Sequence, residues 1–327
     1  MFSFGRSKKV INIVIDDYIM RIVENNGKDL SSITTLAEKL IPQGTIQNGR
    51  IVDEIGFFEF MKEVVQEFRL KNRLCRFFVP QEMVIIRNVT IPNEVKDSEI
   101  KQYITMEIGN SIHFPFKDPV FDLYSIPQVN NQRKVTIIAA PEEEIYKYAN
   151  VFSDVNLKPI AVDMQSLGIY RYFLHQQQET IQNDKVFFLL EISLLSANIS
   201  IFHNRLLEFH RYQSLNLTID NWEISEQTPY SYSFKESETY LHGLIENLMT
   251  EIERLMNFYR FSIHQGEKNV TDIILTGDFP YLDLVKEAIK RFDLPITILD
   301  MDEVMFDHEL SSRGFIPAFG LALKGGK

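Results

Sequence analysis

The sequence predicts a two-lobed α/β protein that carries a small inserted α+β module. Three observations support this fold class. The chain has 327 residues, more than one ordinary domain, and its 45% hydrophobic content is enough for two packed cores. Apolar strand patterns that run into turns occur in both halves, at 11–17, 186–193 and 273–277. Between the first two patterns, residues 81–155 alternate between short strands and helices, which predicts a compact module between larger segments.

Composition and charge exclude several classes of protein. The chain has 34 Lys and Arg against 45 Asp and Glu, a net charge of -11, so nucleic acid is not an expected partner. Its longest apolar stretch, 186–202, is interrupted by Glu191 and several serines and is too short to span a bilayer. Asp16 and Asp17 interrupt the first apolar run, so we expect no secretory leader and a cytoplasmic protein. Cys75 is the only cysteine, which excludes an intrachain disulfide and favours a partly buried strand position.

The first lobe is predicted to be a sheet covered by helices. Residues 9–23 are rich in Ile and Val around Asp16-Asp17, which is the pattern of a β-hairpin. Residues 54–70 predict a helix that lies on the sheet. Its predicted apolar face consists of Ile55, Phe58, Met61, Val64, Val65 and Phe68. Turns are expected at 25–28 and 48–49, and a short strand at 76–79.

The inserted module is predicted as a βαββα series. Its elements in chain order are strand 83–91, helix 98–108, strands 120–126 and 134–140, and helix 142–153. Three glutamates follow Pro141, and they suit the start of a helix because acidic groups stabilise its positive end. Asn130-Asn131 marks the turn between the last two strands. A helix over 164–176 then returns the chain to the first lobe.

The second lobe begins with strands and ends with a βαβ unit. Its expected strands are 185–192, 197–202 and 206–212, followed by loops over 213–234. Residues 237–261 predict a long amphipathic helix, because seven apolar side chains recur at helical spacing. These side chains are Leu241, Leu244, Ile245, Leu248, Ile252, Leu255 and Met256. Strand 272–275, helix 281–292 and strand 296–299 form the βαβ unit, and a final helix covers 316–323.

Several short segments in this order resemble the type IV pilus assembly protein PilM family. They are Gly-Arg-Ile-Val-Asp at 49–53, Arg-Asn-Val-Thr-Ile-Pro at 87–92, Ile-His-Phe-Pro-Phe at 112–116, and similar stretches at 162–166, 251–259, 274–277 and 317–323. That family has the two-lobed actin-like (ribonuclease H-like) ATPase fold, also seen in the cell-division protein FtsA. The resemblance implies subdomain 1A at 1–80, completed by 156–184 and 310–327. It further implies an inserted subdomain 1C at 81–155 and a second lobe, 2A and 2B, at 185–309.

In active members, two hairpins with Asp-x-Gly turns bracket the phosphates of ATP, because glycine admits the phosphate oxygens and aspartate organises magnesium. In the first hairpin of this chain, Val14 stands at the aspartate position and Asp16 at the glycine position. In the second, Glu191 can replace the aspartate, but Ser193 stands for glycine and Ala197 for a hydroxyl residue. The resemblance therefore implies a degenerate phosphate site.

The third turn, which would pass beneath the adenosine, keeps Gly277 but has Asp278 and Phe279 in place of small residues. We expect Gly277 to serve this turn through a positive φ or tight packing, and Glu191 to be a solvated carboxylate at a cleft mouth. The prediction is a pseudo-ATPase without cofactor, catalytic residue or metal ligand. The alternative is a slow or regulatory ATPase that binds ATP with magnesium. Its residual nucleotide contacts would be Asp17, Glu191, Ser193, Gly277 and Asp278.

The family resemblance implies a cytoplasmic scaffold at the inner face of the cell membrane. Such a protein binds the cytoplasmic tail of the inner-membrane protein PilN between 1A and 1C, and the pilus motor ATPase is a second candidate partner. The candidate tail-binding residues are Ile86, Val89, Ile104, Ile108, Ile112, Phe114 and Phe116, although the core of 1C explains such residues equally well. We expect Phe114 or Phe116 to contact the partner and Phe121 to pack inward.

A further alternative is an FtsA-like protein that forms filaments or tethers to a membrane. Such a protein would need an amphipathic tail, and only Lys324, Gly325, Gly326 and Lys327 follow the last predicted helix. The oligomeric state, including a homo-oligomer, is left open by the sequence.

Overall fold

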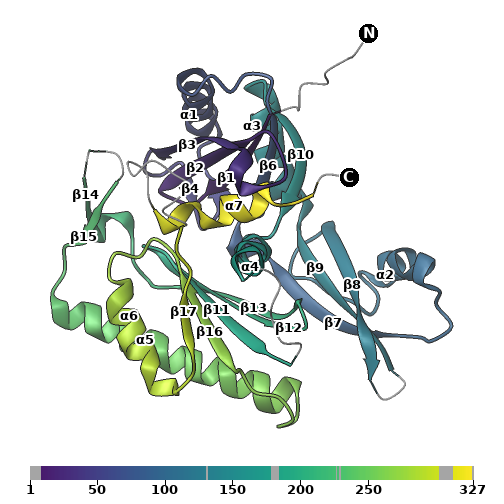
Figure 1. Cartoon of the computed structure of the whole chain (residues 1–327). Coiled ribbons are helices and arrows are strands. Elements are labelled where there is room, and N and C mark those ends of the chain that lie inside the picture. Colours follow the sequence, from purple (N-terminus) through teal and green to yellow (C-terminus); the bar gives the residue numbers. More distant parts are fainter. Residues whose placement is uncertain are drawn as a thin grey trace.

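In the computed structural model, which describes residues 9–129, 132–177, 184–225, 227, 230–301 and 312–325, each half of the chain builds a five-stranded mixed sheet (Figure 1). The first sheet has the order β10-β6-β1-β2-β3. Its strands are β1 (Val10–Ile15), β2 (Ile19–Asn25), β3 (Ile33–Leu40), β6 (Leu74–Phe78) and β10 (Lys158–Asp163). β1, β2 and β3 pair antiparallel, whereas β6 and β10 extend the sheet parallel to β1.

The predicted first hairpin is confirmed. β1 and β2 pair in one register from Val10 opposite Asn25 to Ile15 opposite Met20. The Asp16 N–H donates to the Ile19 carbonyl at 2.9 Å and closes the turn. A second, very short hairpin follows, with β4 (Ile46–Gln47) and β5 (Arg50–Ile51) around the predicted Asn48-Gly49 turn.

Helices cover both faces of the first sheet. They are α1 (Glu54–Glu67), α3 (Glu142–Asp154), α4 (Gln165–Gln176) and α7 (Ile316–Ala322). Phe77 of β6 packs edge-to-face on Phe152 of α3, while the adjacent Arg76 donates to the Leu321 carbonyl of α7 at 3.1 Å. Because successive strand residues point to opposite faces, α3 and α7 lie on opposite sides of the sheet.

The buried face of α1 differs from the predicted face. The helix does lie on the sheet, but its buried residues are Phe57, Phe60, Met61, Val64 and Val65. Ile55, predicted to face the core, is 79% exposed. The Asp53 carboxylate caps the helix by accepting from the Gly56 N–H at 2.9 Å, and Ile55 then falls on the solvent side of the first turn.

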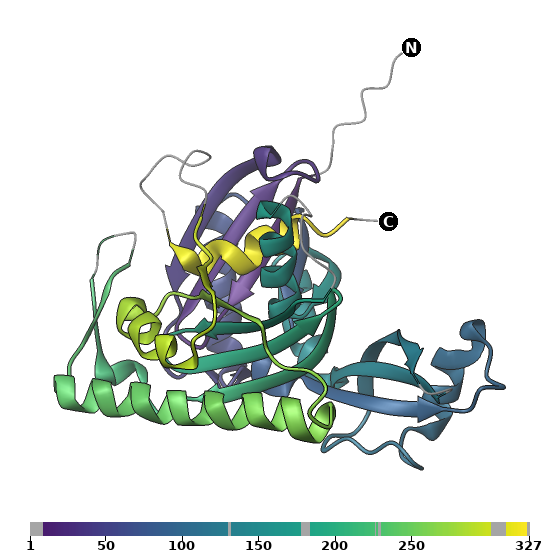
Figure 2. The same cartoon turned by 60° about the horizontal axis from the view of Figure 1, so that its bottom comes forward.

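The inserted module is a three-stranded antiparallel sheet in the order β7-β9-β8 with one helix, and it projects sideways from the lobes (Figure 2). Its elements are β7 (Ile85–Ile91), α2 (Ile100–Glu107), β8 (Pro119–Val129) and β9 (Gln132–Pro141). The predicted turn residues Asn130 and Asn131 lie outside the described residues. α3 follows β9 directly, yet its buried Ile145, Tyr148 and Phe152 belong to the core of the first lobe. The subdomain boundaries stay a prediction.

The second sheet has the order β13-β12-β11-β16-β17. Its strands are β11 (Val186–Ile192), β12 (Ser196–His203), β13 (Leu206–Ser214), β16 (Asp272–Thr276) and β17 (Ile296–Ile298). α6 (Leu282–Ile289) connects β16 to the parallel β17, which confirms the predicted βαβ unit. α5 (Glu238–Asn257) follows the Ser237 cap, and six of its seven predicted core residues are buried, with Met256 partly buried.

Residues 213–234, predicted as loops, also contain a two-stranded sheet of β14 (Trp222–Ile224) and β15 (Tyr232–Phe234). None of the described helices is both long and apolar enough to cross a membrane. Gly326 and Lys327, which follow the last predicted helix, lie outside the described residues.

Candidate functional site

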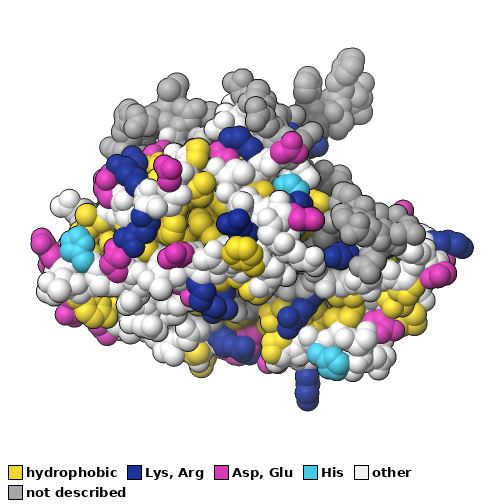
Figure 3. Space-filling model, turned by 90° about the horizontal axis from the view of Figure 1, so that it is seen from below, with side chains coloured by type: hydrophobic (Ala, Val, Ile, Leu, Met, Phe, Trp, Pro, Cys, Tyr) yellow, Lys and Arg dark blue, Asp and Glu magenta, His cyan; other side chains and the backbone are white. Residues whose placement is uncertain are grey.

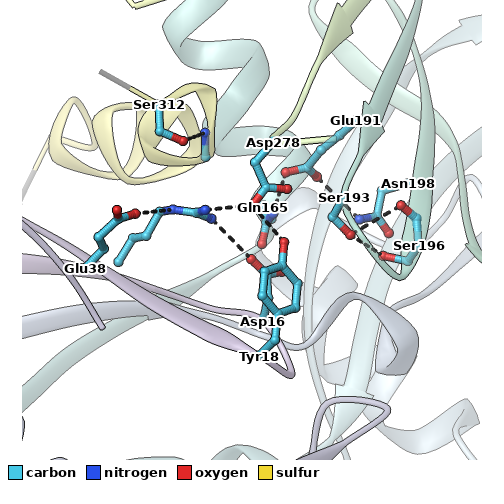
Figure 4. Close-up of polar contacts among 12 residues, drawn as sticks. Asp16, Tyr18, Glu38, Gln165, Glu191, Ser193, Ser196, Asn198, Asp278 and Ser312 are labelled. Carbon is cyan, nitrogen blue, oxygen red and sulfur yellow. Dashed lines mark hydrogen bonds and ion pairs between the residues drawn. The ribbon is translucent and has the colours of Figure 1, made fainter. Parts of the chain in front are cut away.

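Turns from the two lobes meet where the lobes face each other. The β1–β2 turn supplies Asp16, β11 and its turn supply Glu191 and Ser193, and the turn after β16 supplies Gly277 and Asp278. These five residues line one small cavity, and Figure 4 shows their polar side chains grouped together. The three turns that correspond to the ATP-binding turns of active family members therefore come together in space.

Asp17 does not join this group. Its carboxylate accepts from the backbone N–H groups of Asn48 and Gly49, at 2.7 and 2.9 Å. Asp17 thus fixes the β4–β5 hairpin against the first turn, and both of its oxygens are engaged within the first lobe.

A buried arginine occupies the centre of the interlobe contact. Arg21 on β2 has a side chain only 2% exposed, and its Nη2 donates to Asp278 Oδ2 at 2.6 Å. Its Nε donates to Glu38 at 3.3 Å, and its Nη1 lies 3.8 Å from Asp16 (Figure 4). Burial by itself lowers the pKa of Arg21, but Asp278, Tyr18, Tyr232 and Asp16 together outweigh it and the pKa is raised. A cation of the first lobe is therefore paired with a carboxylate of the second.

Two neighbours complete this ion-pair network. The Tyr18 hydroxyl donates to the same Asp278 Oδ2 at 2.7 Å, so this oxygen receives hydrogen bonds from two groups of the first lobe. Gly314 lies against the guanidinium, and a Cβ built there would be 2.3 Å from Arg21 Cζ. Burial and then the charge of Asp278 raise the pKa of Asp16 well above its ordinary value. The network is closely packed and self-contained.

Glu191 is buried, so the prediction of a solvated cleft-mouth carboxylate is wrong. Only 6% of the residue is exposed, because β11 is a central strand with both faces covered. The Gln165 amide donates to Oε1 at 2.5 Å and the Asn198 amide to Oε2 at 3.4 Å. Burial raises the pKa of Glu191 to about 7 despite these hydrogen bonds. Ser193, two residues on, closes its own turn by contacts with Ser196.

Gly277 has the role that the sequence predicts for its turn. Its φ is +112°, and a Cβ there would lie 2.0 Å from the Ile192 carbonyl oxygen. Both the backbone conformation and the close approach of β11 require glycine. Phe279, two residues later, is 2% exposed and packs edge-to-face on Trp222.

The cavities among the facing turns are too small in this structure for a magnesium nucleotide. The cavity lined by Asp16, Glu191 and Asp278 has a volume of about 10 Å³, and the adjoining cavity beside Asp17 and Glu82 about 30 Å³. These volumes admit individual water molecules, not a triphosphate. Among the described residues, no three His, Cys, Asp or Glu side chains are arranged to hold a metal ion. A wider hollow of about 730 Å³ lies beyond Gly277, beside Tyr232, Phe279 and Arg313.

The seven candidate partner-binding residues fall into three groups. Ile104 and Ile112 are 0% and 6% exposed and lie inside the module's own core. Ile86 points to the opposite side of β7 and packs against the core of the first lobe. The other four, Val89, Ile108, Phe114 and Phe116, are partly buried against the module core.

The two candidate phenylalanines form a pair. The rings of Phe114 and Phe116 stack with centroids 5.6 Å apart and planes 16° from parallel. Phe121 packs against the module core, as expected, with Lys101 over its ring.

The module contacts both lobes. Ile86, Tyr124 and Ile138 pack against the core of the first lobe. The Tyr124 hydroxyl also donates to the Leu207 carbonyl on β13 of the second lobe.

Cys75 in β6 is fully buried, and burial raises the pKa of its thiol to about 12, so it is a core residue.

One polar cluster of the second lobe could not be predicted from the spacing of its residues in the sequence. Glu208 on β13 accepts from Tyr259 Oη at 2.6 Å and contacts His264 Nε2 at 2.7 Å and His203 Nδ1 at 3.1 Å. Although burial opposes ionisation, these contacts lower the pKa of Glu208 to about 2. The cluster anchors the segment that follows α5.

Comparisons with known proteins match this architecture. The family model of the type IV pilus assembly protein PilM matches residues 15–324. No curated protein sequence matches the chain. A solved PilM-PilN type IV pilus biogenesis complex contains a chain of 18% identity with a TM-score of 0.75, and the match covers 96% of this chain and 98% of that one.

Two other solved structures are similar over most of their length. The ethanolamine utilization protein EutJ from Carboxydothermus hydrogenoformans has 12% identity and a TM-score of 0.50, covering 97% of this chain and 90% of that one. MreB5 of Spiroplasma citri bound to ADP has 8% identity and a TM-score of 0.48, covering 97% and 96%. The chain has the mixed α/β actin-like ATPase fold, with one five-stranded sheet in each lobe.

Proposed function

The chain belongs to the type IV pilus assembly protein PilM family, and we propose that it is a cytoplasmic scaffold of the pilus machine that binds the tail of a PilN-like inner-membrane protein. The observation that carries this proposal is the match over residues 15–324, which includes the module and both lobes. The similar solved structure is itself a PilM-PilN complex. The pilus motor ATPase is proposed as a second partner on family grounds alone.

The tail site is proposed at the junction of the module and the first lobe. An extended apolar tail binds by burying a few anchor side chains and by strand-like backbone pairing. β7 is an edge strand of the module sheet and β10 an edge strand of the first sheet, so both have one side open for pairing. Phe114 and Phe116 are the proposed anchor contacts, because their stacked rings are only partly buried by the module.

Binding of a synthetic PilN tail peptide, followed by fluorescence anisotropy, tests this site. The double variant Phe114→Ala, Phe116→Ala should bind about 2 kcal/mol more weakly, or roughly thirtyfold. The matched control is Met106→Ala on α2 of the same module, which is 60% exposed and should bind like the wild type. A thermal melt checks that each variant is folded. Full affinity in a folded double variant would remove Phe114 and Phe116 from the site.

We further propose that the protein does not use ATP. The support is the ion-pair network, in which the Arg21 guanidinium and three carboxylates fill the contact between the lobes. A triphosphate would have to displace Arg21 from Asp278 and approach the carboxylates of Asp16 and Glu191. Both steps are unfavourable, because they separate a buried ion pair and bring like charges together.

A slow ATP-binding protein is the second candidate, favoured by the hollow of about 730 Å³ beside Gly277. Titration with a fluorescent ATP analogue and magnesium separates the two. The proposed pseudo-ATPase shows no saturable binding at submillimolar analogue. Micromolar affinity that disappears in Glu191→Gln would overturn this proposal in favour of the second candidate.

A further inference from the structure

Positive charges gather at one edge of the first sheet. The parallel strands β10, β6 and β1 begin at this edge, with Val10 and Lys158 each in register with Leu74, and the antiparallel β2 ends there. Each of these four neighbouring strands has a cation at or just beyond this end. In the order of the sheet, the cations are Lys158, Arg73, Lys9 and Lys28. Because neighbouring strands are about 4.8 Å apart, the cations form a row about 15 Å long.

The connection between α1 and β6 adds two more cations at the same edge. Arg69 and Lys71 lie in this connection, and both are exposed. The connection is held in place, because the Lys158 N–H donates to the Arg73 carbonyl at 2.9 Å and ties the start of β10 to it. We call the six cations the basic edge, which consists of Lys9, Lys28, Arg69, Lys71, Arg73 and Lys158.

Few carboxylates balance the basic edge. Lys9 and Arg73 share the carboxylate of Glu24, at 2.6 and 2.8 Å, and this side chain is only 5% exposed. The exposed acidic residues at this end of the first lobe's strands and of α3 are Asp29 and Asp154. The other four cations form no ion pair with any described residue. Six cations thus stand against three carboxylates, in a chain whose net charge is -11.

The neighbouring sequence has the same character. Residues 1–8, which lie outside the described residues, are joined to the basic edge at Lys9 and contain Arg6 and Lys8 but no acidic residue. On β10, two residues beyond Lys158, Ile160 is 48% exposed and adds an apolar side chain. On the lower face of the molecule, in contrast, acidic side chains lie among the Lys and Arg side chains (Figure 3).

A bilayer that contains anionic lipids fits these charges. The negative surface of such a bilayer attracts clusters of about four to eight Lys and Arg, and each cation strengthens binding by about fivefold. Salt screens exposed charges that are more than about 8 Å apart, so the acidic remainder of the chain does not cancel this local attraction.

The proposed tail site gives a second reason. A tail that belongs to a membrane protein brings the surface beside its binding site close to the bilayer. β10, whose open side is proposed for pairing with the tail, begins at the basic edge with Lys158. We propose that the basic edge contacts the anionic surface of the membrane directly, an inference that rests in part on the proposed function. Each contact then strengthens the other, because a protein held at one point meets the second at high effective concentration.

Co-sedimentation with lipid vesicles tests this inference. The wild type should bind vesicles of phosphatidylglycerol and phosphatidylcholine in equal parts, should not bind pure phosphatidylcholine, and should be released by high salt. Lys71→Gln, Lys158→Gln should bind about 25-fold more weakly, because two unpaired cations are lost. The matched control is Lys235→Gln, Lys290→Gln, which removes two exposed lysines of the second lobe and should bind like the wild type. A thermal melt checks that each variant is folded.

The inference fails if the wild type does not bind the anionic vesicles, or binds neutral vesicles equally well. It also fails if folded Lys71→Gln, Lys158→Gln binds like the control. Retention of the wild type by soluble polyglutamate without vesicle binding would assign the basic edge to an acidic protein and would likewise overturn the inference. The vesicles carry no tail peptide, so vesicle binding and the peptide binding of the proposed function are measured separately, and either can fail while the other stands.

Discussion

Replacing Arg21 by glutamine tests the role of the interlobe ion-pair network. The guanidinium lies 2.6 Å from Asp278, 3.3 Å from Glu38 and 3.8 Å from Asp16, and it is 2% exposed. Glutamine keeps part of the side-chain volume but removes the charge. Removing one partner of a buried ion pair leaves uncompensated charge, so the free energy of unfolding at pH 7.5 should fall by about 3–5 kcal/mol.

The loss should depend on pH. In the wild type, burial and the charge of Asp278 raise the pKa of Asp16, while Arg21 opposes part of that rise. Without Arg21 the pKa of Asp16 rises further. A carboxyl group whose pKa is raised by folding stabilises the folded state below its unfolded pKa, near 4, and this contribution is lost as the pH rises. The deficit of Arg21→Gln should therefore be smaller at pH 4.5 than at pH 7.5.

Urea unfolding at both pH values measures this deficit, with Arg291→Gln as the matched control. Arg291 pairs with Glu246 through two hydrogen bonds, but both side chains are exposed, so its loss should leave the unfolding free energy nearly unchanged. Equal losses in the two variants, or a deficit of Arg21→Gln that does not shrink in acid, would refute the reasoning.

Two further predictions concern the turns beside this network. Burial raises the pKa of Glu191 to about 7, so the contribution of this carboxyl group to stability is present below pH 4.5 and is lost as the pH rises through 7. In urea unfolding, Glu191→Gln should therefore be more stable than the wild type at pH 8 by about 2 kcal/mol. A stability difference between variant and wild type that is the same at pH 5 and pH 8 would contradict this. Gly277→Ala should lose about 3 kcal/mol, because its φ is +112° and its Cβ would meet the Ile192 carbonyl. Its control is Gly243→Ala in α5, where no atom obstructs the Cβ, which should gain about 1 kcal/mol; a thermal melt that ranks the two the other way would contradict the account.

Local sequence patterns predict much of the fold because the central elements have strong periodicity. β11 has five consecutive apolar residues before Glu191, and β16 has three between Asp272 and Thr276, as expected of strands covered on both faces; α5 shows a continuous apolar stripe. β3, in contrast, is absent from the predicted elements. Its sequence, Ile-Thr-Thr-Leu-Ala-Glu-Lys-Leu, contains Ala, Glu and Lys, which are depleted in strands, and it forms because β2 provides a partner.

The candidate site is harder to predict because its parts are distant in the chain. Arg21 and Asp278 are 257 positions apart, so no local pattern indicates their ion pair. A lone arginine within the apolar strand β2 was the available signal for Arg21. The burial of Glu191 likewise depends on amides from α4 and β12. The missing glycines are visible in the sequence, but the ion pair of Arg21 with Asp278 beside these turns becomes visible only in the structure.

The central claim is that this chain is a tail-binding scaffold that works without nucleotide. The most direct measurement is the affinity of the PilN tail peptide for the wild-type protein, by isothermal titration calorimetry, with and without magnesium ATP. The account predicts saturable binding with the same affinity in both conditions. Absence of binding, or an affinity that changes when magnesium ATP is added, would contradict it.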